Sequence, residues 1–263
     1  MIRLAVRVRR EQAELVLAEL LELSPGGVEE VDLGTVVEYA VYGPPGELPA
    51  LPELRAAAGG ALVEVVTSEI ADDWAQRWRE FHRPLVFDGR LTVRPPWEAP
   101  ATTPIDMVID PGQAFGTGAH ATTKLCLELL LSVPAEGAFL DLGCGSGVLA
   151  IAAVLLGFGP VTALDNDAAA VEATRANAVA NGVEMEIRRL DLRTEAVPAA
   201  STVAANLLTP LLLEWTRSLA QGTTRVIASG ILSSQADQVS AAFPMAERAR
   251  LRDGDWAALL LER

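Results

Sequence analysis

The sequence predicts an α/β protein with two parts. The larger part is a doubly wound, mostly parallel sheet that finishes with an antiparallel strand, and the smaller is an N-terminal α/β domain. Apolar runs of strand length alternate with helical patterns over residues 120–263, which is typical of right-handed crossovers in a parallel sheet. Near the end, residues 246–251 and 255–261 flank Arg252-Asp253-Gly254, a hairpin signal. Residues 2–66 follow the order strand, helix, strand, strand, helix, strand, which is ferredoxin-like.

Turn-forming residues divide the N-terminal region into short elements. Ser24-Pro25-Gly26-Gly27 and Gly43-Pro44-Pro45-Gly46 are the clearest turns. The predicted strands are residues 3–9, 28–33, 35–42 and 61–66, and the predicted helices are residues 12–23 and 51–58. Residues 67–83 then predict a connecting helix, and we interpret its aromatic stripe as packing rather than as a cofactor site.

The C-terminal region predicts the main sheet. Strands are expected at residues 90–96, 105–109, 138–141, 161–165, 184–190, 202–205 and 224–229. Helices are expected at residues 122–131, 147–156, 168–180, 210–220 and 233–242. Sheets of this kind bind ligands beyond the carboxyl ends of their strands, where the strand order reverses. We therefore look for the site at those strand ends.

A glycine-rich turn follows the strand at 138–141. Residues 141–147 read D-L-G-C-G-S-G and lead into an apolar helical run. Glycines let the backbone turn sharply and let a ligand approach closely. Asp165 ends the next strand, about 20 residues further on, where a carboxylate can bind ribose hydroxyls. A purely structural turn is the alternative for the loop taken alone. The expected nucleotide contacts here are Gly143, Cys144, Gly145, Gly147 and Asp165.

Two further polar residues end neighbouring strands. Asp191 follows the third strand and is placed to meet an adenine ring. Asn206 follows the fourth, where it either caps a turn or helix or presents its amide to the reacting group.

The segment 110–123 reads D-P-G-Q-A-F-G-T-G-A-H-A-T-T and precedes a helix. One interpretation is a flexible loop whose threonines cap that helix. The other is a lid over the ligand, with donors at the helix N-terminus facing a carboxylate. In that case Phe115, Gly116, Thr117 and Thr122 contact the ligand. His120 is either a base or a structural residue.

Composition narrows the class of partner. The formal net charge is −14, and the arginines form no extended basic stretch, which argues against nucleic-acid binding. An acidic surface suits a basic protein partner, or serves only solubility. Two cysteines and two histidines are too few for a zinc cluster or a disulfide framework, so we expect no metal. No membrane span or signal peptide is expected, and the chain is predicted to be cytoplasmic.

Segment 110–123, with Cys126-Leu127 after it, resembles the signature of the bacterial ribosomal protein L11 methyltransferases, the PrmA family. The resemblance continues in D-L-G-C-G-S-G-V-L-A-I-A-A at 141–153 and A-N-A-V-A-N-G-V at 176–183. It continues further in V-A-A-N-L-L at 203–208 and in S-G-I-L at 229–232, which Gln235 follows. Together the similar segments cover roughly residues 74–240.

The resemblance implies a class I, Rossmann-like methyltransferase that uses S-adenosyl-L-methionine and releases S-adenosyl-L-homocysteine. It implies a recognition domain at 1–66, a linker helix and strand at 67–100, and a catalytic domain at 101–263. The substrate it implies is a basic ribosomal protein, which we expect to be free rather than assembled, and we expect a monomeric enzyme. The cofactor contacts it carries over are Thr122, Gly143, Asp165 and Asn206.

The residues after Asn206 bear on the acceptor. Amide and adenine methyltransferases carry N-P-P-Y at this strand end, whereas here Leu207-Leu208-Thr209 follow, with no aromatic ring to stack a planar group. That favours a flexible amine such as lysine, which must lose its proton before transfer because its pKa is about 10.4. The alternatives are an RNA or small-molecule methyltransferase, a cofactor-binding regulatory protein, and an oxidoreductase.

Overall fold

The structure is a computed structural model of the whole chain, and it describes residues 2–23, 28–43, 48–49, 51–69, 82–110 and 120–263. The chain divides into two compact units, Met1–Phe81 and His82–Arg263, and each is described by itself. Within the described ranges, no helix has both the length and the apolar character that crossing a membrane requires.

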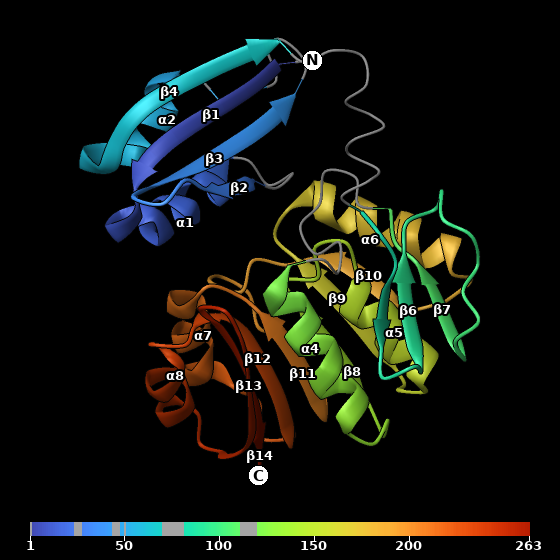
Figure 1. Cartoon of the computed structure of the whole chain (residues 1–263). Helices are drawn as coiled ribbons and strands as arrows, with labels where there is room; N and C mark the ends of the chain where they lie inside the picture. The colour runs from blue at the N-terminus through green and yellow to red at the C-terminus, as the bar shows by residue number, and fades with distance from the viewer. Residues whose placement is uncertain (1, 24–27, 44–47, 50, 70–81, 111–119) are drawn as a thin grey trace. The chain divides into compact units, whose positions relative to one another are not determined.

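The first unit has the predicted order of elements (Figure 1). Its four strands form an antiparallel sheet in the order β2-β3-β1-β4. The strands are β1 (Ile2–Arg9), β2 (Glu29–Asp32), β3 (Val36–Gly43) and β4 (Leu62–Glu69). The helices are α1 (Ala13–Leu23) and α2 (Leu51–Ala58), with 3₁₀ turns at Arg10–Gln12 and Gly59–Ala61.

The two faces of this sheet differ in chemistry because side chains alternate along each strand. Val6 and Val8 pack with Leu20 and Leu54 of the helices in an apolar core. On the opposite face the Glu38 carboxylate accepts hydrogen bonds from Arg3 at 2.5 Å and from Arg7 at 2.7 Å. Burial raises the pKa of Glu38, but these hydrogen bonds outweigh it, so its pKa lies below the usual value.

The second unit contains a seven-stranded sheet in the order β10-β9-β8-β11-β12-β14-β13. Its strands are β8 (Phe139–Leu142), β9 (Val161–Asp165), β10 (Glu186–Arg189), β11 (Thr202–Asn206), β12 (Arg225–Leu232), β13 (Ala246–Asp253) and β14 (Trp256–Glu262). Strands β8 to β12 are parallel, and β14 runs antiparallel to both of its neighbours. The predicted antiparallel last strand is therefore confirmed, but it is inserted between β12 and β13 rather than placed at the edge.

Helices cover both faces of this sheet (Figure 1). They are α4 (Ala121–Ser132), α5 (Val148–Leu156), α6 (Ala168–Ala180), α7 (Thr209–Trp215) and α8 (Ala236–Ala242). The apolar residues of α4 and α5 belong to one core, and those of α7 and α8 belong to a second core on the other face. The α-helix predicted at 210–220 ends at Trp215 and continues as a 3₁₀ turn, and the one predicted from residue 233 begins at Ala236.

A separate three-stranded sheet joins β5 (Leu85–Phe87), β6 (Leu91–Arg94) and β7 (Ile105–Val108). The strands predicted at 90–96 and 105–109 are present, whereas β5 was not predicted because it has only three residues. Asp88-Gly89 makes the tight turn between β5 and β6, with both residues in the left-handed region. The connecting helix expected at 67–83 lies mostly outside the described residues, and its first three residues belong to β4 instead.

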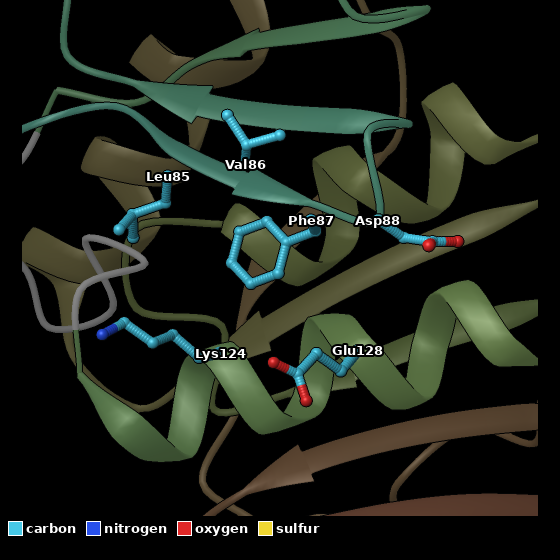
Figure 2. A pocket seen from close by; sticks show the side chains of 6 residues that line it. All are labelled: Leu85, Val86, Phe87, Asp88, Lys124 and Glu128. Carbon is cyan, nitrogen blue, oxygen red and sulfur yellow. The ribbon is translucent and has the colours of Figure 1, made fainter.

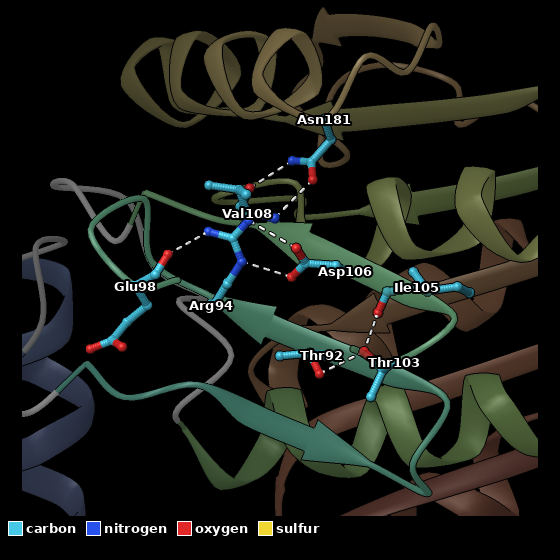
Figure 3. A network of polar contacts seen from close by, with 8 residues as sticks. All are labelled: Thr92, Arg94, Glu98, Thr103, Ile105, Asp106, Val108 and Asn181. Carbon is cyan, nitrogen blue, oxygen red and sulfur yellow. Dashed lines mark hydrogen bonds and ion pairs between the residues drawn. The ribbon is translucent and has the colours of Figure 1, made fainter. Parts of the chain in front are cut away.

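Polar side chains hold this small sheet to the main body (Figure 3). Within the sheet, Arg94 of β6 makes a two-point ion pair with Asp106 of β7, at 2.7 and 2.8 Å. Asn181 at the end of α6 accepts from Val108 N at 2.8 Å and donates to Val108 O at 2.6 Å. Asn177 of α6 accepts from Asp110 N at 3.0 Å. Strand β7 and the residues after it are therefore fixed on α6.

Replacing Asn181 with alanine should destabilise the protein by about 1–3 kcal/mol, because the substitution leaves both backbone groups of Val108 without their partner. Chemical denaturation measures the free energy of unfolding. Gln221→Ala, at an exposed amide, is the control and should stay within about 0.5 kcal/mol of the wild type. Equal stability of the two variants would contradict the anchoring role of Asn181.

Candidate functional site

The conformation of the glycine loop between β8 and α5 is set by its backbone dihedral angles and backbone hydrogen bonds. Gly143, Gly145 and Gly147 all have positive φ, at 80°, 53° and 80°. The N–H groups of Gly143 and Cys144 donate to the Leu164 carbonyl at the end of β9, at 2.8 and 3.0 Å. A Cβ on Gly143 would collide with the Leu207 side chain. The loop is thus fixed to a neighbouring strand and needs glycine for reasons of both conformation and space.

The side chain of Cys144 points into the protein rather than toward a ligand. Cys144 is buried, and its sulfur lies 3.3 Å from the hydroxyl of Thr174 in α6. Burial raises the pKa of Cys144 well above the usual range, so the side chain is a thiol. Thr174 also donates to the Gly145 carbonyl at 2.9 Å, and a Cβ on Gly147 would lie 2.7 Å from its methyl group. Cys144 can therefore serve a ligand only through its backbone.

Asp165 lies across from the loop, as the sequence predicts. One carboxylate oxygen accepts from Gly145 N at 2.9 Å and the other from Asp167 N at 3.0 Å. Burial raises the pKa of Asp165, and these backbone hydrogen bonds only partly oppose the shift. Each carboxylate oxygen has two lone pairs, so both keep capacity for a hydroxyl donor. Ribose hydroxyls supply donors of that kind.

A backbone hydrogen bond between the ends of β9 and β10 places Asp191 close to Asp165. Leu190 N donates to the Asp165 carbonyl at 2.8 Å, which places the next residue at the same edge of the sheet. The Asp191 carboxylate accepts from Arg193 N at 3.0 Å, an arrangement that fixes its turn. The expected meeting of the ends of β9 and β10 is therefore observed.

Asp141 was not predicted as a site residue, although it directly precedes the glycine loop. It is 1% exposed, and one of its oxygens accepts from Ala150 N in α5 at 3.0 Å. The described residues offer no hydrogen-bond partner to its other oxygen. Burial, reinforced by the nearby charge of Asp165, raises the pKa of Asp141 to about 7. Its position as the acidic residue two places before the first glycine was the signal that could have indicated it.

Asn206 and the start of α4 meet at the end of β11. The Asn206 amide nitrogen donates to the Thr123 hydroxyl at 3.4 Å, so the amide oxygen remains as the acceptor on that side chain. Ser229 of β12 is 3.2 Å from the carbonyl of Thr122 and ties the same helix turn to the sheet. Thr122 and Thr123 are each 1% exposed. The structure therefore brings the predicted Thr122 and Asn206 together.

His120 is the N-cap of α4. Its Nδ1 accepts from Thr122 N at 3.4 Å and lies 2.8 Å from the Thr122 hydroxyl. The ring meets Trp256 edge-on, with 5.1 Å between the ring centroids. Burial lowers the pKa of His120, which favours the neutral imidazole that a cap requires. Phe115, Gly116 and Thr117 lie outside the described residues.

A separate pocket of about 470 Å³ lies between β5 and α4 (Figure 2). It is lined by Leu85, Val86, Phe87, Asp88, Lys124 and Glu128. None of the predicted site residues that the structure describes lines it.

The arrangement defines a class of protein. When β8 to β14 are counted as strands 1 to 7, the strand order is 3-2-1-4-5-7-6. This order, the glycine loop after β8 and the carboxylate of Asp165 at the end of β9 make this a class I methyltransferase fold. Residues 52–263 match the family model described as ribosomal protein L11 methyltransferase (PrmA). The chain belongs to the ribosomal protein L11 methyltransferase family, and it is thus an S-adenosylmethionine-dependent protein methyltransferase.

Individual relatives agree with this. The L11 methyltransferase of Pelobacter propionicus is 37% identical, covering 76% of this chain and 69% of its own. The enzyme of Pseudomonas putida (strain W619) is 43% identical, covering 72% of this chain and 68% of its own. A solved L11 methylase from Lactobacillus delbrueckii subsp. bulgaricus superposes with a TM-score of 0.60 and 28% identity, covering 69% of this chain and 99% of that one. The match to Symbiobacterium thermophilum covers 65% of that relative.

Asp141→Asn should change the pH dependence of stability. In the wild type, the folded state holds a proton on Asp141 up to a pKa of about 7, whereas the unfolded state releases it near 4. The stability from this group is present below pH 4 and is lost as the pH rises to 7. The variant cannot ionise there, so its free energy of unfolding should gain on the wild type by up to about 1.4 kcal/mol per pH unit over that window.

Urea unfolding at several pH values measures the difference between the two proteins. Asp255→Asn, at an exposed turn, controls for the amide substitution itself. A difference that stays constant between pH 4 and 7 would contradict the raised pKa of Asp141.

Proposed function

We propose that this protein transfers methyl groups from S-adenosylmethionine to lysine side-chain amines, and to the terminal amine, of ribosomal protein L11. The supporting observation is the convergence of the glycine loop, Asp165 and Asn206 at one edge of the sheet, with Thr122 beside them. The relatives named above carry this substrate in their names. The matched regions span about two thirds of the length of these relatives, and we propose the same substrate for this chain.

The residues fit the donor. A Cβ at Gly143 would meet the Leu207 side chain and one at Gly147 the Thr174 side chain, so glycine is needed for this loop conformation, and Asp165 has lone pairs left for ribose hydroxyls. Asp141 adds a buried carboxylate oxygen for which the described residues supply no donor, beside a ligand that carries an ammonium and a sulfonium group. The donor supplies a methyl group already activated on sulfur. We assign ribose binding to Asp165, the adenine side to Asp191, and the loop contacts to the backbone of residues 143–147.

The acceptor amine must be neutral to attack, because a lysine with a pKa of about 10.4 has no free lone pair at neutral pH. The half-buried apolar side chain of Leu207 disfavours the charged ammonium by desolvation. The Asn206 oxygen can hold one N–H of the neutral amine, since its amide nitrogen is turned to Thr123. His120 supports this arrangement by fixing Thr122 rather than by taking the proton. We assign to Phe115 the exclusion of water from the site.

Charge favours a protein substrate over RNA. The net charge of −14 attracts a basic ribosomal protein and repels phosphate. We assign recognition of that protein to residues 1–66, a linking role to residues 67–100, and chemistry to residues 101–263. A monomer acting in the cytoplasm on the free protein is the simplest form of this proposal.

Transfer of labelled methyl groups to purified ribosomal proteins tests the function. Label should enter L11 and not ribosomal RNA, and peptide mapping should find it on lysines and the terminal amine. A chain lacking residues 1–66 should keep its donor affinity and lose transfer to intact L11. Label in RNA alone, or no binding of the donor, would overturn the proposal.

Asn206→Ala should lower kcat by roughly 100-fold, because the acceptor nitrogen loses the group that orients it. The Kd for the donor, measured by calorimetry, should change by less than about threefold, since the predicted donor contacts in the glycine loop and at Asp165 are untouched. The exposed Gln221→Ala serves as the control. Equal losses of turnover and donor affinity would assign Asn206 to donor binding instead.

A further inference from the structure

The segment from Asn206 to Thr209 lies in unusually close contact with β12. Leu207 N donates to the Ser229 carbonyl at 3.0 Å. Gly230, with φ +80°, has no Cβ, and one placed there would lie 2.5 Å from the Leu207 oxygen and 2.9 Å from its nitrogen. On its other side the Leu207 side chain abuts Gly143 of the glycine loop. Leu207 is thus held between two glycines, directly after the residue proposed to orient the acceptor.

The far end of this segment is held by one side-chain oxygen. Oε1 of Gln235 accepts from the Thr209 hydroxyl at 2.7 Å and from Leu232 N at 3.0 Å. Thr209 begins α7 and is 7% exposed, while Leu232 ends β12. Gln235 N also donates to the Leu232 carbonyl at 2.8 Å, which fixes the turn that carries the side chain. A single amide therefore joins the start of α7 to the end of β12.

The orientation of Asn206 depends on these anchors more than on its own contact. Its hydrogen bond to Thr123 is long, at 3.4 Å, and long hydrogen bonds constrain a side chain weakly. The backbone of Asn206 pairs with Ser229 in the sheet, and three residues later Thr209 is fixed by Gln235. Without the second anchor, the buried Thr209 hydroxyl loses its acceptor, and the start of α7 loses its side-chain hydrogen bond to the end of β12 while keeping its apolar packing. Displacements near 1 Å cost about 100-fold in rate when they reach a reacting group.

We propose that Gln235 is a positioning residue for methyl transfer: through Thr209 it fixes the turn that carries Asn206 and Leu207 against the glycine loop. The inference rests on the proposed function, because it concerns the part of the site that we propose to hold the acceptor amine. Gln235 acts through Thr209 and is not itself a group that touches substrate.

Gln235→Leu, which keeps the size and removes the acceptor, should lower kcat for L11 methylation by roughly 10- to 100-fold. The donor Kd should change by less than about threefold, because Gln235 holds no predicted donor contact. Gln235→Glu keeps an oxygen acceptor for both donors and should recover activity to within about threefold of the wild type. Gln238→Leu, at an exposed glutamine of α8, the helix that Gln235 precedes, is the matched control and should behave as the wild type.

A second pair of variants keeps the proposal testable if Gln235→Leu fails to fold. Thr209→Val should reproduce the loss and Thr209→Ser should restore it. The double variant Gln235→Leu/Thr209→Val should be no slower than either single variant, because both remove the same contact. Unchanged kcat in Gln235→Leu or Thr209→Val, or equal losses of kcat and donor affinity, would overturn the positioning role.

Hydrogen exchange gives a readout that does not need activity. Amide exchange in residues 206–212 should accelerate in Gln235→Leu and not in Gln238→Leu. If the wild type transfers no methyl group to L11 but exchange accelerates as expected, the proposed function fails and the anchor stands. If the wild type is active and exchange in residues 206–212 is unchanged, the anchor fails.

Discussion

The whole site depends on the backbone of Leu207 lying where two glycines leave room for it. Its peptide rests on Gly230 of β12 and its side chain on Gly143 of the glycine loop, so the loop, the end of β11 and the middle of β12 form one packed unit. A side chain at Gly230 would collide with the Leu207 backbone, and one at Gly143 would collide with the end of the Leu207 side chain. The bulge in the β12–β14 pairing between Ala228 and Ile231 accommodates this contact within the sheet. The close approach of Leu207 to β12 therefore coincides with a local irregularity in that strand.

The carboxylates of Asp141 and Asp165 determine the electrostatics of the site near the glycine loop. Asp141 is buried near the carboxyl end of β8, Asp165 is half-buried at the end of the adjacent β9, and the nearby charge of Asp165 adds to burial in raising the pKa of Asp141. A cationic ligand relieves that cost, whereas an anionic one would add to it. The acidic chain as a whole has the same preference, which links the choice of donor and of protein substrate to a single sign of charge.

Much of this could be predicted from sequence because its signals are local. Glycines after an apolar run, a carboxylate ending the next strand, and the Arg252-Asp253-Gly254 turn each specify their surroundings within a few residues. What sequence did not indicate depends on partners far along the chain. Gln235 meets Thr209 across 26 positions, and the importance of Asp141 comes from burial that no short pattern reports. Strand β5 was missed for the opposite reason, since three residues give no periodicity, although Asp88-Gly89 marked its turn.

The β5–α4 pocket contains the one lysine of the chain, Lys124, with its side chain along the wall (Figure 2). An enzyme that alkylates ε-amines therefore offers almost no target of its own. Through their side chains, copies of the chain at high concentration therefore compete little with the substrate protein for the methyl donor, because self-modification of ε-amines is limited to Lys124.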